Sequence, residues 1–182
     1  MRRAPGFWQQ RLTAPWQAVP LCRDARGQEW EEGAQGRDPR KVRARVEQAV
    51  DHWIAQARQL PGLDRLAAPL PRPPLHYDLR GEVAGMAVSE RRPGETPRQW
   101  IRLHPELLLR YPVRMIQQTL PHEIAHLAVD WYLPRASDDP HGPEWMAVMV
   151  YFGRPPLVSH TMQIQPPRRS RRRDPRALSL PL

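Results

Sequence analysis

The stretch TLPHEIAHLAVDWYLPRASDDPHGPEW, from Thr119 to Trp145, contains three of the seven histidines of this chain. Apolar residues in and before it recur at helical spacing between Val113 and Tyr132, which predicts a helix. Pro121 lies inside this run, and we expect a kink or a helix restart there because proline removes a backbone donor. His122 and His126, four residues apart, then project from the same side of the helix and can bind one ion.

Other polar residues near this pair suggest a catalytic metal site. Glu123 is rotated by about 100° from His122, so its carboxylate can reach a water on the metal without being a ligand, as a general base should. A catalytic zinc keeps three protein ligands and one open position. His141, at the start of the next expected helix, is the favoured third ligand. Glu144 is the alternative, but it lies inside that helix and its charge can instead stabilise the first turn.

The rest of the chain predicts an α+β domain with a small twisted sheet packed on the first helix and on the metal-binding helix. The first helix has about twenty residues, with Asp38 as its N-cap and Pro39 at its first position. Alternation predicts two strands within 75–88, joined by a turn at Arg80-Gly81, and a third strand at 99–103. Gly85 indicates a bulge or a close backbone approach. Short helices are expected at 104–112 and 143–153, and a strand or extended segment at 157–165.

The charge is concentrated at one end of the chain. Residues 38–165 are expected to fold, residues 1–37 to form a flexible N-terminal extension and residues 166–182 a basic disordered tail, because neither end has the apolar residues that would offset ordering entropy. Of the net charge of +9, residues 168–182 contribute +5. Such a run is typical of a nucleic-acid arm, and equally of a solvated chain end. Its arginines are Arg168, Arg169, Arg171, Arg172, Arg173 and Arg176.

Other classes of protein fit the sequence poorly. Cys22 is the only cysteine, which excludes an intramolecular disulfide and a cysteine-based zinc site in this chain. There is no serine or cysteine nucleophile motif. The first residues lack the apolar run of a secretory signal, and no stretch approaches the ~20 apolar residues of a membrane span. We therefore expect a cytoplasmic protein without a membrane partner.

Four segments, in order and over about residues 38–165, resemble the SprT-like metalloprotease family, which includes Spartan. They are YDLRGEVAGMA, IRLHPELLL, LPHEIAHL and HGPEW. The resemblance implies a zincin-like fold, a single zinc held by His122, His126 and His141, and Glu123 as the group that activates water. The better-known members are DNA-dependent proteases that act on proteins crosslinked to DNA.

The chain departs from the family pattern at two places. The family usually has Asn where this chain has His104, which we interpret as a replacement N-cap at a helix start. Bacterial members commonly end in a four-cysteine zinc ribbon, and no cysteine follows Cys22. If the arginine tail replaces that ribbon, it would contact DNA phosphates without reading bases. The alternative DNA-contacting site lies on the domain, at Arg91, Arg92, Arg98 and Trp100.

The sequence therefore predicts a zinc-dependent metalloprotease that hydrolyses peptide bonds with a metal-activated water and acts on DNA-associated or DNA-crosslinked proteins. The alternative is a non-catalytic, zinc-containing DNA-binding or interaction module. Glu123 discriminates between the two, because a structural zinc does not need a carboxylate beside an open position. The sequence does not choose among the candidates for an oxyanion donor, which are Tyr77, Tyr132 and His160.

Overall fold

The computed structural model describes residues 38–61, 68–133, 139–160 and 162–163. The predicted extension at 1–37 and the predicted tail at 166–182 lie outside the described residues. The described part of the chain is a mixed α+β protein in which one helix precedes three consecutive strands and the remaining helices follow them, and a π-helical turn at Met115–Thr119 precedes α5. The other elements are α2 (Pro39–Ala57), β1 (Leu75–His76), β2 (Gly85–Glu90), β3 (Arg98–Leu103), α3 (Pro105–Arg110), α4 (Pro112–Arg114), α5 (Leu120–Tyr132) and α6 (Pro143–Tyr151).

The sheet has three strands in the order β1-β3-β2. β2 pairs antiparallel with β3, with Ala87 opposite Ile101, whereas β1 pairs parallel with β3, with Leu75 opposite Ile101. The predicted turn at Arg80-Gly81 does lie between two strands, β1 and β2, but these strands are not neighbours in the sheet, because β3 lies between them. Gly81 still makes a turn with a positive φ of 76°, but this turn leads the chain across the sheet rather than back along β1. β2 is thus an edge strand.

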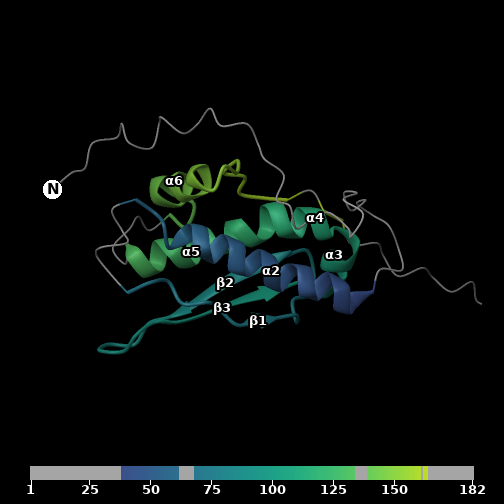
Figure 1. Cartoon of the computed structure of the whole chain (residues 1–182), viewed down its shortest axis with the longest axis horizontal. Helices are drawn as coiled ribbons and strands as arrows, with labels where there is room; N and C mark the ends of the chain where they lie inside the picture. The colour runs from purple at the N-terminus through teal and green to yellow at the C-terminus, as the bar shows by residue number, and fades with distance from the viewer. Residues whose placement is uncertain (1–37, 62–67, 134–138, 161, 164–182) are drawn as a thin grey trace, which may run out of the picture.

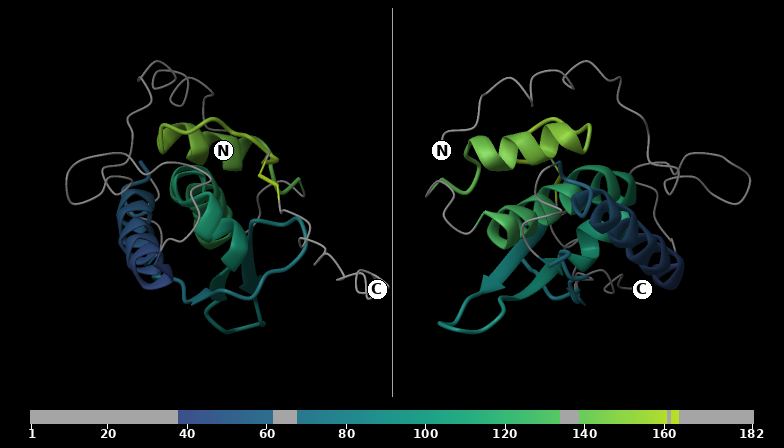
Figure 2. Two further views of the ribbon diagram at one scale, coloured as in Figure 1. Left: turned by 90° about the vertical axis from the view of Figure 1, so that its right-hand side faces the viewer. Right: turned by 60° about the vertical axis from the view of Figure 1, so that its left-hand side comes forward.

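Three layers build the described part of the protein. Figure 1 shows the sheet at the bottom, α2 and α5 above it and α6 at the top, and the two views of Figure 2 show the same order. α5 contacts α2, α6, β2 and the π-helical turn, so it is the central element. The sheet packs on α5 as expected, whereas α2 packs along α5 and α3. α2 reaches the β1 end of the sheet through Tyr77, whose hydroxyl lies 3.4 Å from Glu47 Oε1.

Helix α2 forms where its apolar spacing predicts it. Asp38 is the N-cap, and its side chain accepts a hydrogen bond from the Arg40 backbone N–H at 2.9 Å. One face of the helix is buried and continuous with the core, and its members are Val42, Val46, Ala49, Val50, Trp53, Ile54 and Ala57. No helix in the described ranges is long and apolar enough to cross a membrane.

Pro121 sets the path of the chain into α5. The expected interruption takes the form of the π-helical turn, in which the N–H of Leu120 bonds to the carbonyl of Met115. Pro121 has no N–H to offer, so the carbonyl of Ile116 receives no bond from either residue. The indole N–H of Trp53 bonds to this carbonyl instead, at 3.0 Å. Trp53 is 1% exposed, so α2 closes the buried gap that the proline creates.

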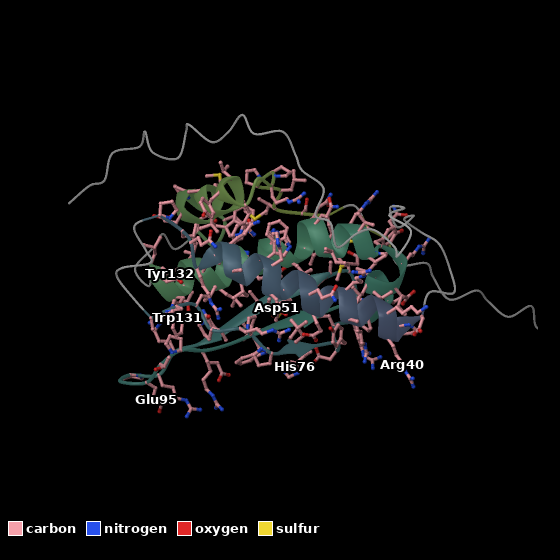
Figure 3. All side chains as sticks on the ribbon, in the orientation of Figure 1. Arg40, Asp51, His76, Glu95, Trp131 and Tyr132 are labelled. Carbon is pink, nitrogen blue, oxygen red and sulfur yellow. The ribbon has the colours of Figure 1, made fainter. Side chains whose placement is uncertain are left out.

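The far end of α5 is fixed by two aromatic residues. Figure 3 shows Trp131 and Tyr132 at this end, near the start of the chain segment that leads to β1. The Leu70 N–H donates to the hydroxyl of Tyr132 at 3.0 Å, and the indole N–H of Trp131 donates to the Ala68 carbonyl at 2.7 Å. These bonds pin the proline-rich segment that precedes the sheet onto α5.

Candidate metal centre

Three histidines from two elements converge on one point. His122 and His126 lie on α5, and His141 lies just before α6. The Nε2 atom of His122 is 3.1 Å from Nε2 of His126 and 3.1 Å from Nε2 of His141. Their potential ligand atoms all lie within 4.8 Å of one another. The helical spacing of the sequence brings the first pair together, and packing of α6 on α5 brings the third.

This spacing fits a shared metal ion. Two imidazole nitrogens bound to one zinc at about 2.0–2.1 Å with tetrahedral angles would lie about 3.3–3.4 Å apart. Burial lowers the pKa of His122 to about 4 and that of His126 to about 3. Both rings are therefore neutral at pH 7. Two Nε2 atoms 3.1 Å apart either share a proton or, when both are unprotonated, repel each other unless a cation lies among them. The three residues could hold a metal ion.

Contacts behind the histidine rings fix the tautomer and the ring orientation of His122. Its Nδ1 lies 3.2 Å from the carbonyl of Leu157. A carbonyl only accepts, so this bond places the proton on Nδ1 and leaves the Nε2 lone pair facing the cluster. Trp145, at 1% exposure, packs against all three histidines with ring centroids 4.6–5.5 Å away. Its indole N–H also donates to the His122 carbonyl at 3.3 Å.

Glu123 lies next to the cluster and is almost completely buried, at 6% exposure. Its Oε2 accepts the backbone N–H of Ala87 on β2 at 2.7 Å. Burial raises the pKa of Glu123 to about 7, although the Ala87 hydrogen bond opposes this shift. A carboxyl group with a pKa near neutrality can both accept and return a proton at physiological pH.

The close approach expected at Gly85 is what brings β2 against Glu123. A Cβ at this position would lie 2.6 Å from Thr119 Cγ2, 2.8 Å from Glu123 Oε1 and 2.9 Å from Glu123 Cγ. Only a residue without a side chain fits this gap. Gly85 therefore lets the edge strand come close enough for Ala87 to bond the carboxylate.

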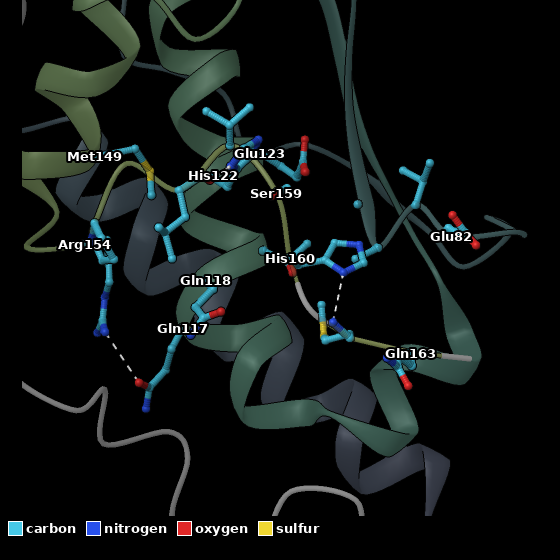
Figure 4. Close-up of a pocket in the computed structure, with 18 residues that line it drawn as sticks. Glu82, Gln117, Gln118, His122, Glu123, Met149, Arg154, Ser159, His160 and Gln163 are labelled. Carbon is cyan, nitrogen blue, oxygen red and sulfur yellow. Dashed lines mark hydrogen bonds between the residues drawn. The ribbon is translucent and has the colours of Figure 1, made fainter. Parts of the chain in front are cut away.

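Two cavities adjoin at Gly85, His122 and Glu123, one on each side of the site. The first has a volume of about 860 Å³ and extends toward residues 154–163 (Figure 4). The second has a volume of about 630 Å³ and extends toward the end of α5 and His141. The histidines and the carboxylate thus lie in the middle of a cleft that is open on both sides.

The other predicted site residues lie outside the three-histidine cluster. Glu144 lies in the first turn of α6, as its capping interpretation requires, and it lines the second cavity outside the group of three converging donors. Tyr77 and Tyr132 line neither cavity and bond to Glu47 and Leu70 instead. His160 lines the first cavity, where its Nδ1 accepts the Met162 N–H at 3.3 Å (Figure 4).

Two further predictions concern residues away from the cleft. His104 is the N-cap of α3, and its Nδ1 accepts the Leu107 N–H at 3.3 Å, which confirms its interpretation as a replacement cap. Arg91, named above in the alternative DNA-contacting site, donates to the Asp130 carbonyl at 2.7 Å. Its guanidinium is therefore already engaged on α5.

Sequence reasoning missed three contributors to the site: Ala87, Leu157 and the position of Trp145 beneath the rings. Two of them act through backbone atoms, which carry no residue-specific signal. Trp145 did have a signal, because it follows His141 by four residues at the start of an expected helix. Because α6 begins between His141 and Trp145, both side chains can reach the same neighbour, His122.

The site and the fold together define a mixed α+β protein with a cluster of three histidines that could hold a metal ion and a buried carboxylate beside it. The SprT-like family model matches residues 51–163, and the chain belongs to that family. Protein SprT of Erwinia tasmaniensis is 35% identical over 128 residues, which are 69% of this chain and 69% of that protein. Protein SprT of Shigella sonnei is 34% identical over 126 residues, 69% of this chain and 70% of that protein.

Protein SprT of Pasteurella multocida is 40% identical over 93 residues, and the match covers 50% of this chain and 51% of that protein. The chain thus spans about half the length of this relative and about two thirds of the other two. No solved structure shows a significant match to the chain.

The first prediction from this geometry concerns Gly85. Gly85→Ala should lower the free energy of unfolding by about 1–3 kcal/mol, the usual cost of forcing an extra methyl into a packed site, and should displace Glu123 from Ala87. Urea unfolding measures the loss. Adding Thr119→Ser removes the Cγ2 atom that is nearest to the new methyl, so the double variant should recover part of it. Equal stability of wild type and Gly85→Ala would contradict the close packing.

The second prediction concerns pH and the metal-free protein. The folded pKa of Glu123, about 7, lies above its ordinary value of 4.5. Ionisation therefore removes stability as the pH rises from about 4.5 through 7, and Glu123→Gln avoids this loss. The stability of Glu123→Gln relative to wild type should increase over that window by up to roughly 3 kcal/mol.

Urea unfolding in a metal chelator at pH 5, 6, 7 and 8 measures this difference. The buried histidines are common to both proteins, so their contribution cancels. A difference that does not change with pH would show that the carboxyl group ionises without penalty.

Proposed function

We propose that this protein is a zinc metalloendopeptidase with a zincin-like catalytic domain. The observation that carries the proposal is the convergence of three imidazoles next to a buried carboxylate in the middle of an open cleft. His122, His126 and His141 would hold the zinc. When bound, zinc lowers the pKa of a water molecule and polarises the scissile carbonyl.

The residues of the chain would carry the proton. Glu123 would accept a proton from the attacking water and return it to the leaving amine. The Ala87 N–H holds Oε2 at 2.7 Å, which leaves Oε1 as the oxygen for the water. Trp145 and the Leu157 carbonyl would keep His122 in orientation.

The cleft supports a polypeptide as the substrate. β2 is an edge strand beside Glu123. The Ala87 N–H donates to Glu123, so it points away from β3. In an antiparallel pair every second residue points its backbone groups the same way, so the backbone groups of Gly85 and Ser89 also point away from β3. An extended peptide can add to such an edge through backbone hydrogen bonds, and it would then pass through both cavities.

The DNA-related part of the proposal rests on the family resemblance. We propose that the substrates are DNA-associated or DNA-crosslinked proteins. We also propose that the arginines of the tail contact the DNA; these arginines lie outside the described residues. The alternative function is a zinc-containing DNA-binding or interaction module without turnover. The buried carboxylate at the open side of the histidine cluster favours the peptidase, because a purely structural site gains nothing from it.

The third prediction tests the ligands. Protein purified without metal-affinity resin should contain about one zinc per chain, as one three-histidine site requires. His122→Ala, His126→Ala and His141→Ala should each lower the zinc content sharply, as measured by mass spectrometry. Glu144→Ala is the matched control and should keep its zinc. Full zinc in His141→Ala together with loss in Glu144→Ala would make Glu144 the third ligand.

The fourth prediction tests the reaction. Glu123→Gln should keep near-wild-type zinc and lose at least ~10²-fold in cleavage rate, the usual scale for a lost general base. The substrates are an unfolded protein and a DNA-bound protein, each with and without single-stranded DNA. Equal cleavage by both enzymes would refute the proposed role of Glu123, and no cleavage by zinc-loaded wild type would favour the binding module.

A further inference from the structure

The exposed apolar side chains of the described residues gather at the cleft. Five large apolar residues are exposed among the described residues, and four of them line one of the two cavities. Three belong to the first cavity: Val83 at 46% exposure, Leu157 at 54% and Val158 at 60%. Exposed apolar side chains that gather around a concave surface mark a binding site more often than scattered ones do.

These three residues come from two separate segments. Val83 precedes β2, and Leu157 and Val158 follow α6, so the cavity has apolar side chains on two walls. Met149 and Met162, at 2% and 7% exposure, line the same cavity and belong to the core. The cavity therefore borders the packed core.

The same cavity reaches the proposed reaction centre. Its lining includes His122 and Glu123 (Figure 4), and the carbonyl of Leu157 lies 3.2 Å from Nδ1 of His122. A side chain bound between Val83 and Val158 would therefore belong to a residue close to the scissile bond. Gln117, Gln118 and Ser159 also line the cavity and offer amide and hydroxyl groups to a peptide backbone. A mainly apolar pocket with a few polar groups is the usual form of a ligand site.

The second cavity has a different character. Glu123 lines both cavities. The second also has the carboxylates of Asp130, Asp139 and Glu144, whereas the first has the carboxylate of Glu82 and the guanidinium of Arg154. Among the described residues, Met86 is the one exposed large apolar residue of the second cavity, against three in the first. An apolar side chain gains more from the first cavity, because carboxylates lose hydration when an apolar group covers them. The two halves of the cleft should therefore accept different side chains.

We propose that the first cavity is a specificity pocket for one large apolar side chain, such as Leu, Ile, Met or Phe, on one side of the scissile bond. The proposal rests on the peptidase function proposed above. Such residues are buried in folded proteins and exposed in unfolded segments. The pocket therefore directs the enzyme toward polypeptide segments whose apolar residues are accessible.

The first experiment measures binding without turnover. Zinc-loaded Glu123→Gln is titrated with two fluorescein-labelled decapeptides that differ only at one central residue, Leu or Ser, and fluorescence anisotropy gives the affinities. We expect the Leu peptide to bind at least about tenfold more tightly, the scale of a hydrophobic pocket that gains or loses a few methylenes. Val83→Ser and Val158→Ser should remove most of this difference.

Met146→Ser is the matched control, because Met146 is 42% exposed on α6 and lines neither cavity. It should leave the preference for Leu unchanged. All three replaced side chains are substantially exposed, so loss of the fold is not expected. Equal affinity for both peptides, or an unchanged preference in both pocket variants, would overturn the proposal.

The second experiment reads the preference from cleavage products. Wild-type enzyme acts on a peptide mixture, and mass spectrometry locates the cut bonds. Large apolar residues should be enriched at one fixed position relative to the cut, and Val158→Asp should shift this enrichment toward Lys and Arg. Cleavage without such enrichment would contradict the proposed specificity pocket and would still support the proposed peptidase activity. Preferred binding of the Leu peptide without cleavage would support the pocket and contradict the peptidase.

Discussion

The contact between β2 and α5 at Gly85 is the constraint on which the site depends. The missing side chain lets an edge strand approach Thr119 and Glu123 closely enough for the Ala87 N–H to bond the carboxylate at 2.7 Å. The packing of β2 on α5 helps to bury Glu123 and sets the strand edge beside the histidines. Burial raises the pKa of Glu123, against the opposing effect of the Ala87 hydrogen bond. The low exposure that makes the carboxyl group a suitable proton carrier is therefore a consequence of sheet packing rather than of the helix alone.

The helix itself depends on a second constraint, at Pro121. The proline comes one residue before His122, and the chain accommodates it with a π-helical turn. The turn leaves the Ile116 carbonyl without a bond from the helix, and the indole N–H of Trp53 on α2 donates to it. π-helical turns are often found at functional sites, and here Gln117, Gln118 and Thr119 of the turn also line the first cavity. The long helix α2, remote from the metal centre in sequence, thus supports the start of α5.

Much of this arrangement could be predicted from the sequence. Helical spacing placed His122 and His126 on one face, and the isolated Gly85 correctly indicated a close backbone approach. The order of strands could not be predicted, because a two-residue β1 leaves almost no alternation to interpret and a glycine turn fits a hairpin as well as a crossover. Contacts through backbone atoms, such as those of Ala87 and Leu157, were also out of reach, since any residue provides them. His141 was predicted from chemistry, but only the packing of α6 on α5 brings it to the pair.

We propose that three imidazoles and one open position surround a single zinc. This coordination can be measured by X-ray absorption spectroscopy at the zinc edge, on protein purified without metal-affinity resin. We expect three nitrogen ligands and one oxygen ligand at about 2.0–2.1 Å, with one nitrogen lost in His141→Ala. A sulfur ligand, or a nitrogen count that His141→Ala leaves unchanged, would contradict it.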